Sequence, residues 1–245
     1  MEPEAYHEMA ATEATHWWFA ARRAISRALI ARLGLPHPAR ILEVGAGTGG
    51  NWPMLAAFGT LAAMEVNPEA LALARAGLPP GLAVDMREGR LPDGVPFAGP
   101  FDLVCLFDVL EHIDDDGAAL QALRPLCGTG GRLLLTVPAH PWLWSAHDAF
   151  LHHQRRYTAA GLRACLEGAG FEVLRLTPLN AWLFPLVVAA RLGGRLLGRA
   201  GAVGSPLPAP WLNALLRRVY ASERHWLARA DLPVGVSLLA LARPR

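Results

Sequence analysis

The chain has 245 residues, which is enough for one large domain with a full hydrophobic core. All 23 basic residues are arginines spread along the chain, and the formal net charge of only +2, with no basic run, argues against a nucleic-acid partner. The three cysteines, Cys105, Cys127 and Cys165, are far apart and never in C-x-x-C spacing, which argues against a disulfide framework and a zinc site.

Neither secretion nor a membrane span is expected. The first residues, MEPEAYHEMAATEATHWWF, are acidic and lack the basic and apolar regions of a signal peptide. The most apolar stretch, residues 181–190, ends at Arg191 and is shorter than the roughly 20 residues that a spanning helix needs. We therefore expect a cytoplasmic protein.

From Arg40 onward, short apolar runs alternate with helical patterns, which is typical of a parallel sheet with helices on both faces. Asn67 and Pro68 have the residue types of an N-cap and a first helical position, and Thr158 and Gly170 are suited to begin and close a later helix. Strands are expected at residues 40–44, 61–65, 82–86, 101–107, 132–137, 171–176 and 236–242, with helices at 52–58, 68–76 and 115–126.

The clearest motif is the run ILEVGAGTGGN at residues 41–51, a buried strand that enters a glycine-rich turn. Glycines there permit positive φ and let the backbone approach a ligand closely. Gly45, Gly47 and Gly50 also satisfy the G-x-G-x-x-G dinucleotide fingerprint, with Glu65 at the distance of its ribose-binding carboxylate. Two cofactors therefore fit this loop.

Glu43 helps to separate the two cofactors. A carboxylate at the end of the first strand would repel a pyrophosphate but suits a cationic ligand such as S-adenosylmethionine, which carries a sulfonium and an ammonium group. Glu65 would then accept hydrogen bonds from both ribose hydroxyls.

The order of motifs resembles the class I S-adenosylmethionine-dependent methyltransferases. The matching segments are E-V-G-A-G-T-G, Glu65, F-D-L-V with D-V-L-E-H-I, and G-G-R-L-L-L-T-V-P, between about Arg40 and Phe171. Further segments, H-W-W-F-x-x-R-R, L-W-S-x-H-D, H-x-R-R-Y-T and D-L-P-x-G-x-S, are similar to a bacterial branch whose members mostly lack an assigned acceptor.

The resemblance implies an α/β fold with a Rossmann-like, doubly wound sheet of seven strands, the last one antiparallel. One domain would comprise an N-terminal helical cap (1–35), a cofactor-binding core (36–177), a helical insertion (178–233) and the final strand (234–245). The cofactor residues that it implies are Glu43, Gly45, Ala46, Gly47, Glu65, Val66, Arg90, Leu91, Phe107, Asp108, Trp18 and Arg23. Trp17, Trp18 and Arg23 would close over the cofactor, or the same helix would bury its aromatic residues on the sheet.

Methyl transfer to a hydroxyl or an amine needs a base, and histidine suits this role at neutral pH. The loop after the fifth strand contains His140, His147, Asp148, His152 and His153. We predict His147 as the base with Asp148 or Tyr157 nearby, and His140 as the second candidate. Alternatively, Asp148 and His153 pin this loop by binding Arg155 and Arg156.

Asp108, Glu111 and His112 would share one face of a helix, where a divalent metal could bind. Some quinone-biosynthesis methyltransferases have a similar acidic-x-x-E-H segment. In most of the superfamily this segment is structural, so no metal ligand is assigned.

Arg191, Arg195 and Arg199 form a basic stripe beside leucines in residues 181–199. Such a segment suits peripheral contact with the inner face of a membrane, although a helix that packs over the sheet edge has the same pattern.

The predicted function is methyl transfer from S-adenosylmethionine, leaving S-adenosylhomocysteine, to an oxygen or nitrogen of a small-molecule or lipid-linked acceptor. The alternatives are a metal-dependent methyltransferase of quinone-type lipids, an NAD(P)-dependent oxidoreductase and a non-catalytic cofactor-binding protein. The oligomeric state stays open.

Overall fold

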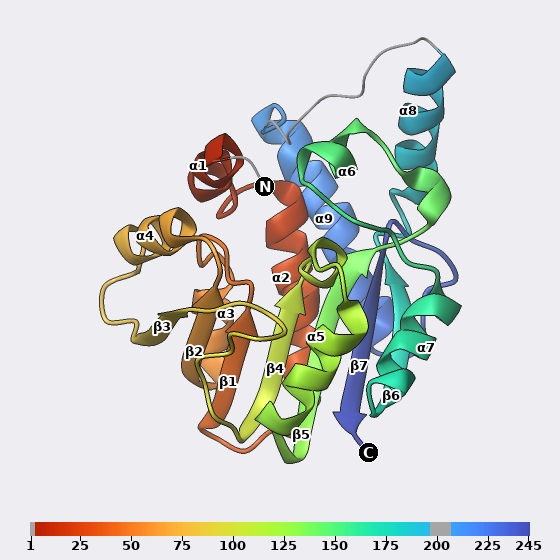
Figure 1. Ribbon diagram of the computed structural model, residues 1–245. Helices are drawn as coiled ribbons and strands as arrows, with labels where there is room; N and C mark the ends of the chain where they lie inside the picture. The colour runs from red at the N-terminus through yellow and green to blue at the C-terminus, as the bar shows by residue number, and fades with distance from the viewer. Residues whose placement is uncertain (1–2, 197–206) are drawn as a thin grey trace.

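The computed structural model describes residues 3–196 and 207–245, which build one α/β unit around a single sheet (Figure 1). The sheet has seven strands in the order β3-β2-β1-β4-β5-β7-β6, and β7 runs in the direction opposite to the other six. The strands are β1 (Ala39–Val44), β2 (Gly59–Glu65), β3 (Val84–Glu88), β4 (Phe101–Phe107), β5 (Cys127–Pro138), β6 (Phe171–Leu179) and β7 (Ser237–Pro244). The predicted fold class is confirmed.

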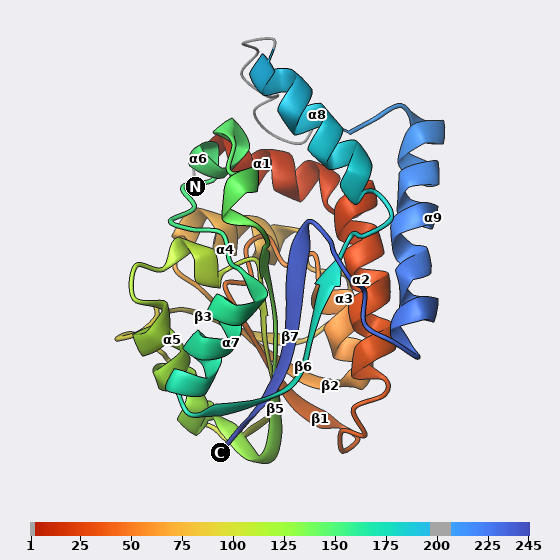
Figure 2. The same cartoon turned by 90° about the vertical axis from the view of Figure 1, so that its right-hand side faces the viewer.

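Helices cover both faces of the sheet (Figure 2). On one face, α5 (Asp116–Leu123) and α7 (Ala159–Gly168) bury their leucines against β4, β5 and β7. On the other face, α2 (Trp17–Ile30), α3 (Trp52–Leu55) and α9 (Pro210–Leu227) contribute to a second core, and α2 packs along α9. The remaining helices are α1 (Pro3–Thr12), α4 (Pro68–Ala76), α6 (Ala146–Phe150) and α8 (Phe184–Leu196), with short 3-10 turns at Ala56–Phe58, Leu110–His112, Arg124–Leu126 and Pro141–Leu143.

The predicted helix signals act as expected. Asn67 caps α4 by accepting hydrogen bonds from the amides of Glu69 and Ala70, and Thr158 caps α7 through the amide of Gly161. Gly170 follows α7 with φ of 85°, a conformation that favours glycine after a helix. The fifth strand begins at Cys127, five residues before its predicted start, because an irregular pairing with Phe101 extends it.

The predicted insertion contains α8 and α9, and its Gly/Pro-rich centre, residues 197–206, lies outside the described residues. The carboxylate of Glu223, on α9, accepts hydrogen bonds of 2.8, 2.7 and 3.1 Å from the backbone amides of Asn180, Ala181 and Trp182. This contact fixes the corner between β6 and α8. Within the described residues, no helix combines the length and apolar character needed to cross a bilayer.

The sheet order reverses direction between β1 and β4, so the connections that leave their carboxyl ends diverge to opposite faces. In doubly wound sheets, ligands bind in the crevice at this point. The glycine-rich turn after β1 and Asp108 after β4 both lie there.

Candidate functional site

The glycine loop is held against the end of the neighbouring strand. The amides of Gly45 and Ala46 both donate to the carbonyl of Met64, at 2.9 and 3.1 Å. Gly45 and Gly47 have φ of 68° and 55°, which side chains other than glycine rarely adopt. A Cβ at Gly45 would also lie 2.5 Å from the Val109 side chain, so a larger residue cannot be accommodated without a shift.

The carboxylate of Glu65, at the end of β2, accepts hydrogen bonds from three backbone amides. Its Oε2 accepts from the amide of Gly47 at 2.9 Å, and its Oε1 accepts from Val66 and Asn67 at 3.0 Å each. A carboxylate has about four acceptor positions. Three of these positions are occupied, which leaves one on Oε2, and the binding of both ribose hydroxyls by Glu65 stays a prediction.

Glu43 lies beneath the loop rather than on the cavity surface. It is only 1% exposed, its Oε1 accepts from the side chain of Asn51 at 2.8 Å, and its Oε2 has no partner among the described residues. Burial, with a further contribution from Glu13, raises its pKa to about 8 despite the Asn51 bond and nearby Arg22. An added positive charge nearby would favour its ionised form.

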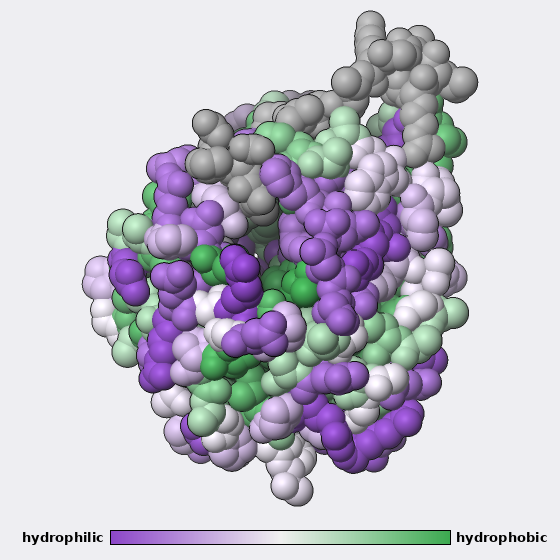
Figure 3. All heavy atoms as spheres, in the orientation of Figure 1, coloured by the Kyte–Doolittle hydropathy of each residue, from purple (hydrophilic) through white to green (hydrophobic). Residues whose placement is uncertain are grey.

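A cavity of about 1230 Å³ opens at the carboxyl edge of the sheet. In the space-filling view, a hollow near the centre of this face has hydrophobic residues inside and hydrophilic residues around it (Figure 3). The structure brings twelve of the predicted site residues together in its wall: Trp18, Gly45, Ala46, Gly47, Glu65, Val66, Arg90, Leu91, Phe107, Asp108, His147 and Asp148.

Arg90 and Leu91 follow β3 as predicted, but their backbone is partly committed. The amide of Arg90 donates to the carbonyl of Gly94 at 3.0 Å, and the amide of Gly94 donates back at 2.8 Å. The Arg90 amide is therefore engaged within its own turn, while the side chain of Leu91 is buried at the cavity wall.

Arg22, rather than the predicted Arg23, reaches the cavity. Arg22 is buried, forms an ion pair with Asp108 and lies over the rings of Phe19 and Phe107, with its guanidinium carbon 5.6 and 5.8 Å from their centres. Arg23 turns away and donates to the carbonyls of Glu13 and Ala14. Neighbouring helix residues point about 100° apart, so only a knowledge of which face of α2 meets the sheet separates the two arginines.

Trp18 has contacts with both the cavity and a neighbouring helix, and its closure over a cofactor stays a prediction. Trp18 lines the cavity, and its ring also lies 5.6 Å from Trp17 and 5.5 Å from Tyr220 of α9. Several residues of the N-terminal segment, Tyr6, Met9 and Glu13 among them, line the same cavity and were not predicted individually. The sequence carries no signal for them beyond an acidic, weakly amphipathic start.

Asp148 anchors the loop after β5. Its carboxylate is fully buried and accepts from the Nε of Arg156 at 2.8 Å and from the amide and hydroxyl of Ser145 at 2.8 and 2.9 Å, and it lies 3.1 Å from the Nδ1 of His153. Burial alone would raise the pKa of Asp148, but the bonds from His153, Arg156 and Ser145 hold it below its ordinary value. Arg155 instead pairs with Asp116, at 2.9 Å.

The histidines of this loop lie in different places. His147 lines the cavity, and burial lowers its pKa, although neighbouring Asp148 acts in the opposite direction. His140 packs against Trp142 and Phe184, with ring centres 5.5 and 5.4 Å away, and is not part of the cavity wall.

Tyr157 also lies away from the cavity. Its hydroxyl donates to the carboxylate of Asp116 at 2.7 Å, and burial, together with Asp116, raises its pKa. The structure therefore does not bring Tyr157 near His147 at the cavity.

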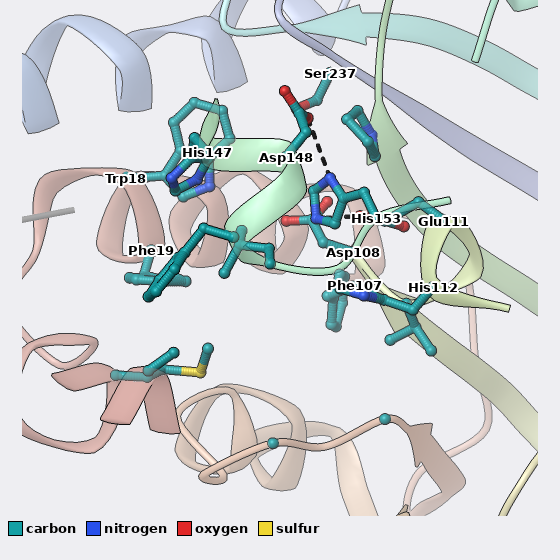
Figure 4. Close-up of a pocket in the computed structure, with 18 of the residues that line it drawn as sticks. Trp18, Phe19, Phe107, Asp108, Glu111, His112, His147, Asp148, His153 and Ser237 are labelled. Atoms are coloured by element: carbon teal, nitrogen blue, oxygen red, sulfur yellow. Dashed lines mark hydrogen bonds and ion pairs between the residues drawn. The ribbon is translucent and has the colours of Figure 1, made fainter. Parts of the chain in front are cut away.

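Glu111, His112 and His153 gather on the cavity side opposite Trp18 (Figure 4). One ligand atom from each lies within 4.8 Å of the others, and His153 Nε2 is 3.9 Å from Glu111 Oε1. Glu111 is fully buried, and neither carboxylate oxygen has a hydrogen-bond partner in the described part of the chain. Burial, reinforced by Asp108, raises the pKa of Glu111 well above its ordinary value. Sequence reasoning named Asp108, Glu111 and His112 but missed His153 as the third member.

Only part of the predicted basic stripe can be placed. Arg191 of α8 turns inward, where it donates to the carbonyl of Leu143 and lies 3.5 Å from Asp148. The side chain of Arg195, and Arg199 as a whole, lie outside the described residues.

Comparison with known proteins gives the family. The model of a methyltransferase domain matches residues 16–176. The ubiquinone biosynthesis O-methyltransferases of Xanthomonas axonopodis pv. citri and Xylella fastidiosa are 35% and 36% identical over 105 and 102 residues, which is 42% and 40% of this chain. The matches span less than half the length of these curated relatives, at 44% and 42%.

Solved structures support the fold. A structure of the Haloferax volcanii Trm112 methyltransferase activator in complex with a methyltransferase matches with a TM-score of 0.62 and 16% identity, covering 98% of this chain and 96% of the other. A TehB-like SAM-dependent methyltransferase from Corynebacterium glutamicum matches with a TM-score of 0.57 and 15% identity, covering 91% and 88%. The [4+2]-cyclase SpnF matches with a TM-score of 0.59 and 19% identity, covering 91% and 80%.

The name of that cyclase illustrates that the fold alone does not determine the reaction. The family match, however, covers about two thirds of this chain, including the glycine loop, Glu65, Asp108 and the loop anchored by Asp148. The chain therefore belongs to the methyltransferase domain family, within the class I S-adenosylmethionine-dependent methyltransferases.

Proposed function

We propose that this protein transfers a methyl group from S-adenosylmethionine to an oxygen or nitrogen of a small-molecule or lipid-linked acceptor. The observation that carries the proposal is the continuity of one cavity from the glycine loop and Glu65 to His147. Methyl transfer from a sulfonium is an in-line displacement, which requires the donor and the acceptor to be aligned in one water-poor chamber.

The donor end has the charges that this cofactor needs. Arg22 matches the carboxylate of the methionine end, Asp108 matches its ammonium group, and Glu65 retains an acceptor position for a ribose hydroxyl. In the structure Arg22 and Asp108 pair with each other. Binding would exchange this ion pair for two pairs with the ligand.

The acceptor end is bounded by aromatic and aliphatic residues of several elements. Trp144 and His147 come from the loop after β5, and Val187 and Ala190 come from α8. These residues suit an acceptor with an apolar body, and the names of the curated relatives agree with O-methylation of such a molecule. His147, whose pKa is lowered by burial, is suited to remove the proton of an attacking hydroxyl or amine.

Replacement of His147 tests the proposed base. His147→Ala should lower kcat by about 10²-fold or more, the ordinary contribution of a general base, and leave the affinity for S-adenosylhomocysteine unchanged. The assay follows S-adenosylhomocysteine formation with a panel of phenols, aliphatic alcohols and amines. His225→Ala, at an exposed position on α9, is the control and should behave as wild type. Unchanged turnover in His147→Ala would remove this residue from the mechanism.

Glu43 makes stability depend on pH. Because its pKa is raised from 4.5 to about 8, the folded protein holds this proton while the unfolded chain releases it, so stability falls as pH rises from about 4.5 to 8. The free energy of unfolding of the wild type should fall relative to that of Glu43→Gln by up to about 1.4 kcal/mol per pH unit in this window. Urea unfolding between pH 5 and 8 measures the difference, and parallel curves for the two proteins would contradict the buried neutral carboxyl group.

A metal-assisted variant of the same reaction is the second candidate. The site of Glu111, His112 and His153 fits a divalent cation because a buried carboxylate without a partner and two imidazoles converge there. Asp148 orients His153, as carboxylates commonly orient ligating histidines. A bound cation would polarise the acceptor oxygen and lower the pKa of the acceptor hydroxyl.

Metal addition separates this candidate from metal-free transfer. Zn²⁺ and Mn²⁺ should raise the Tm of the wild type after dialysis against a chelator, and Glu111→Gln should abolish that rise because it removes the anionic ligand. Glu167→Gln, a change at a half-exposed position on α7 that loses only an i, i+4 pair with Arg163, is the matched control. If chelation changes neither turnover nor Tm and added metal has no effect, the metal-assisted mechanism is wrong.

We also propose peripheral membrane contact by residues 181–199. Leu186 and Leu192 of α8 are 61% and 44% exposed, and Trp182 just before this helix is 44% exposed. Arg191 turns inward and binds the carbonyl of Leu143. The proposed attraction to anionic lipid would therefore come from the charges of Arg195 and Arg199.

Vesicle binding tests this contact. The protein should co-sediment with phosphatidylglycerol vesicles at low salt and lose most of that binding with uncharged vesicles or after Leu186→Asp. No sedimentation with anionic vesicles at low salt would rule out attachment through this segment.

A further inference from the structure

Glu13 lies between α1 and α2 and reaches the far side of the glycine loop. Its Oε1 accepts from the hydroxyl of Thr48 at 2.6 Å, and its carboxylate also receives the amide of Gly50. A Cβ at Gly50 would lie 2.3 Å from this carboxyl group. The glycine there accordingly makes room for Glu13, in addition to any role toward a cofactor.

The residues before Glu13 cover the other side of the same loop. Met9 packs against Gly47, with its sulfur 3.6 Å from the position a Cβ would occupy. Tyr6 is buried, lines the cavity and lies close enough to Glu65 for that carboxylate to contribute, after burial, to the rise of the Tyr6 pKa to about 12. The helix α1 therefore lies over the loop and the end of β2, as Figures 1 and 2 show.

The residues after Glu13 are hydrogen-bonded to α9. Asn213 of α9 accepts from the amide of Trp17 at 2.8 Å and donates to the carbonyl of Thr15 at 2.9 Å. Arg23 donates to the carbonyl of Glu13 itself, at 2.7 Å. The backbone at Glu13 is thus fixed, while α1 touches the body mainly through the cavity wall and an exposed contact of 2.8 Å between His7 and Glu69.

We propose that Glu13 is a positioning residue for the methyl donor, which it holds through the glycine loop. Its carboxylate binds Thr48 and Gly50 and so fixes the outer part of the loop, residues 48–50. The same contact holds α1 against the inner part of the loop, residues 45–47. Glu65 holds that inner part from the other side. The loop is thus held between two carboxylates, one from the sheet and one from the cap. The identity of the donor rests on the proposed function.

Coupled substitutions test this role in the full-length protein. Titration calorimetry with S-adenosylhomocysteine should give about tenfold weaker binding for Glu13→Ala and for Thr48→Val, which removes the partner hydroxyl with little change of shape. The double variant should be no weaker than the weaker single variant, because each change breaks the same contact. Gly50→Ala should have a similar effect by displacing the carboxylate, and Glu167→Ala is the matched control.

Hydrogen exchange and kinetics distinguish positioning from simple stabilisation. Exchange in residues 3–12 and 45–50 should be faster in Glu13→Ala than in the wild type with ligand bound, and KM for the donor should rise more than kcat falls. Additive effects of the two single changes, or a lowered Tm with unchanged affinity of the folded protein, would overturn the proposal. If the wild type itself binds no S-adenosylhomocysteine, the donor and this role both fail; wild-type binding with unchanged affinity in Glu13→Ala overturns the role of Glu13 alone.

Discussion

The hydrogen bond from the amide of Gly47 to the carboxylate of Glu65 is the contact on which the site depends. It joins the turn after β1 to the end of β2, so that the loop stays open toward the cavity while the amides of Gly45 and Ala46 bind the carbonyl of Met64. A turn with positive φ at three alternate glycines, Gly45, Gly47 and Gly49, would otherwise have many conformations, because glycine restricts the backbone so little. Hydrogen bonds at both ends of this turn hold an otherwise flexible backbone in one conformation, so that the binding site is preformed.

Ionisable groups that a folded protein normally avoids burying gather in and around the cavity. Glu43, Glu65 and Glu111 are all at most 5% exposed, and Arg22 and Arg156 are the buried cations near them. Burying carboxylates without full compensation costs stability, and the raised pKa values of Glu43 and Glu111 reflect that cost. Such perturbed groups cluster at functional sites, and a ligand with a sulfonium and an ammonium group would favour the ionised forms of these carboxyl groups.

The sequence predicts the parts of this protein that follow from local chemistry. The alternation of apolar runs, the cap at Asn67 and the glycines after β1 each act through residues close in sequence, and all seven strands are found near their predicted positions. Most of the predicted cofactor residues lie in the cavity wall, because the topology brings the carboxyl ends of the strands together, whereas Glu43 and Arg23 do not. Their contact with a cofactor stays a prediction.

The parts that the sequence did not predict depend on contacts between distant segments. Nothing local distinguishes Arg22 from Arg23, and only the packing of α2 selects the one that meets Asp108. Likewise, His153 joins Glu111 because Asp148 and Arg156 fold the loop back, whereas Tyr157 is drawn to Asp116 on the other side. The proposed acceptor end consists of residues from the loop after β5 and from α8. The amino-acid types in these segments indicate which groups are present, but not where they lie.

The central claim is that the carboxylate-pinned loop forms a seat for a cationic sulfur cofactor rather than for a dinucleotide. Parallel calorimetric titrations of the wild-type protein with S-adenosylmethionine and with NADH test it most directly. The account predicts saturable binding of S-adenosylmethionine at one site per chain, with a dissociation constant in the micromolar range or below, and no measurable heat of binding for NADH. Binding of NADH without binding of S-adenosylmethionine would contradict it.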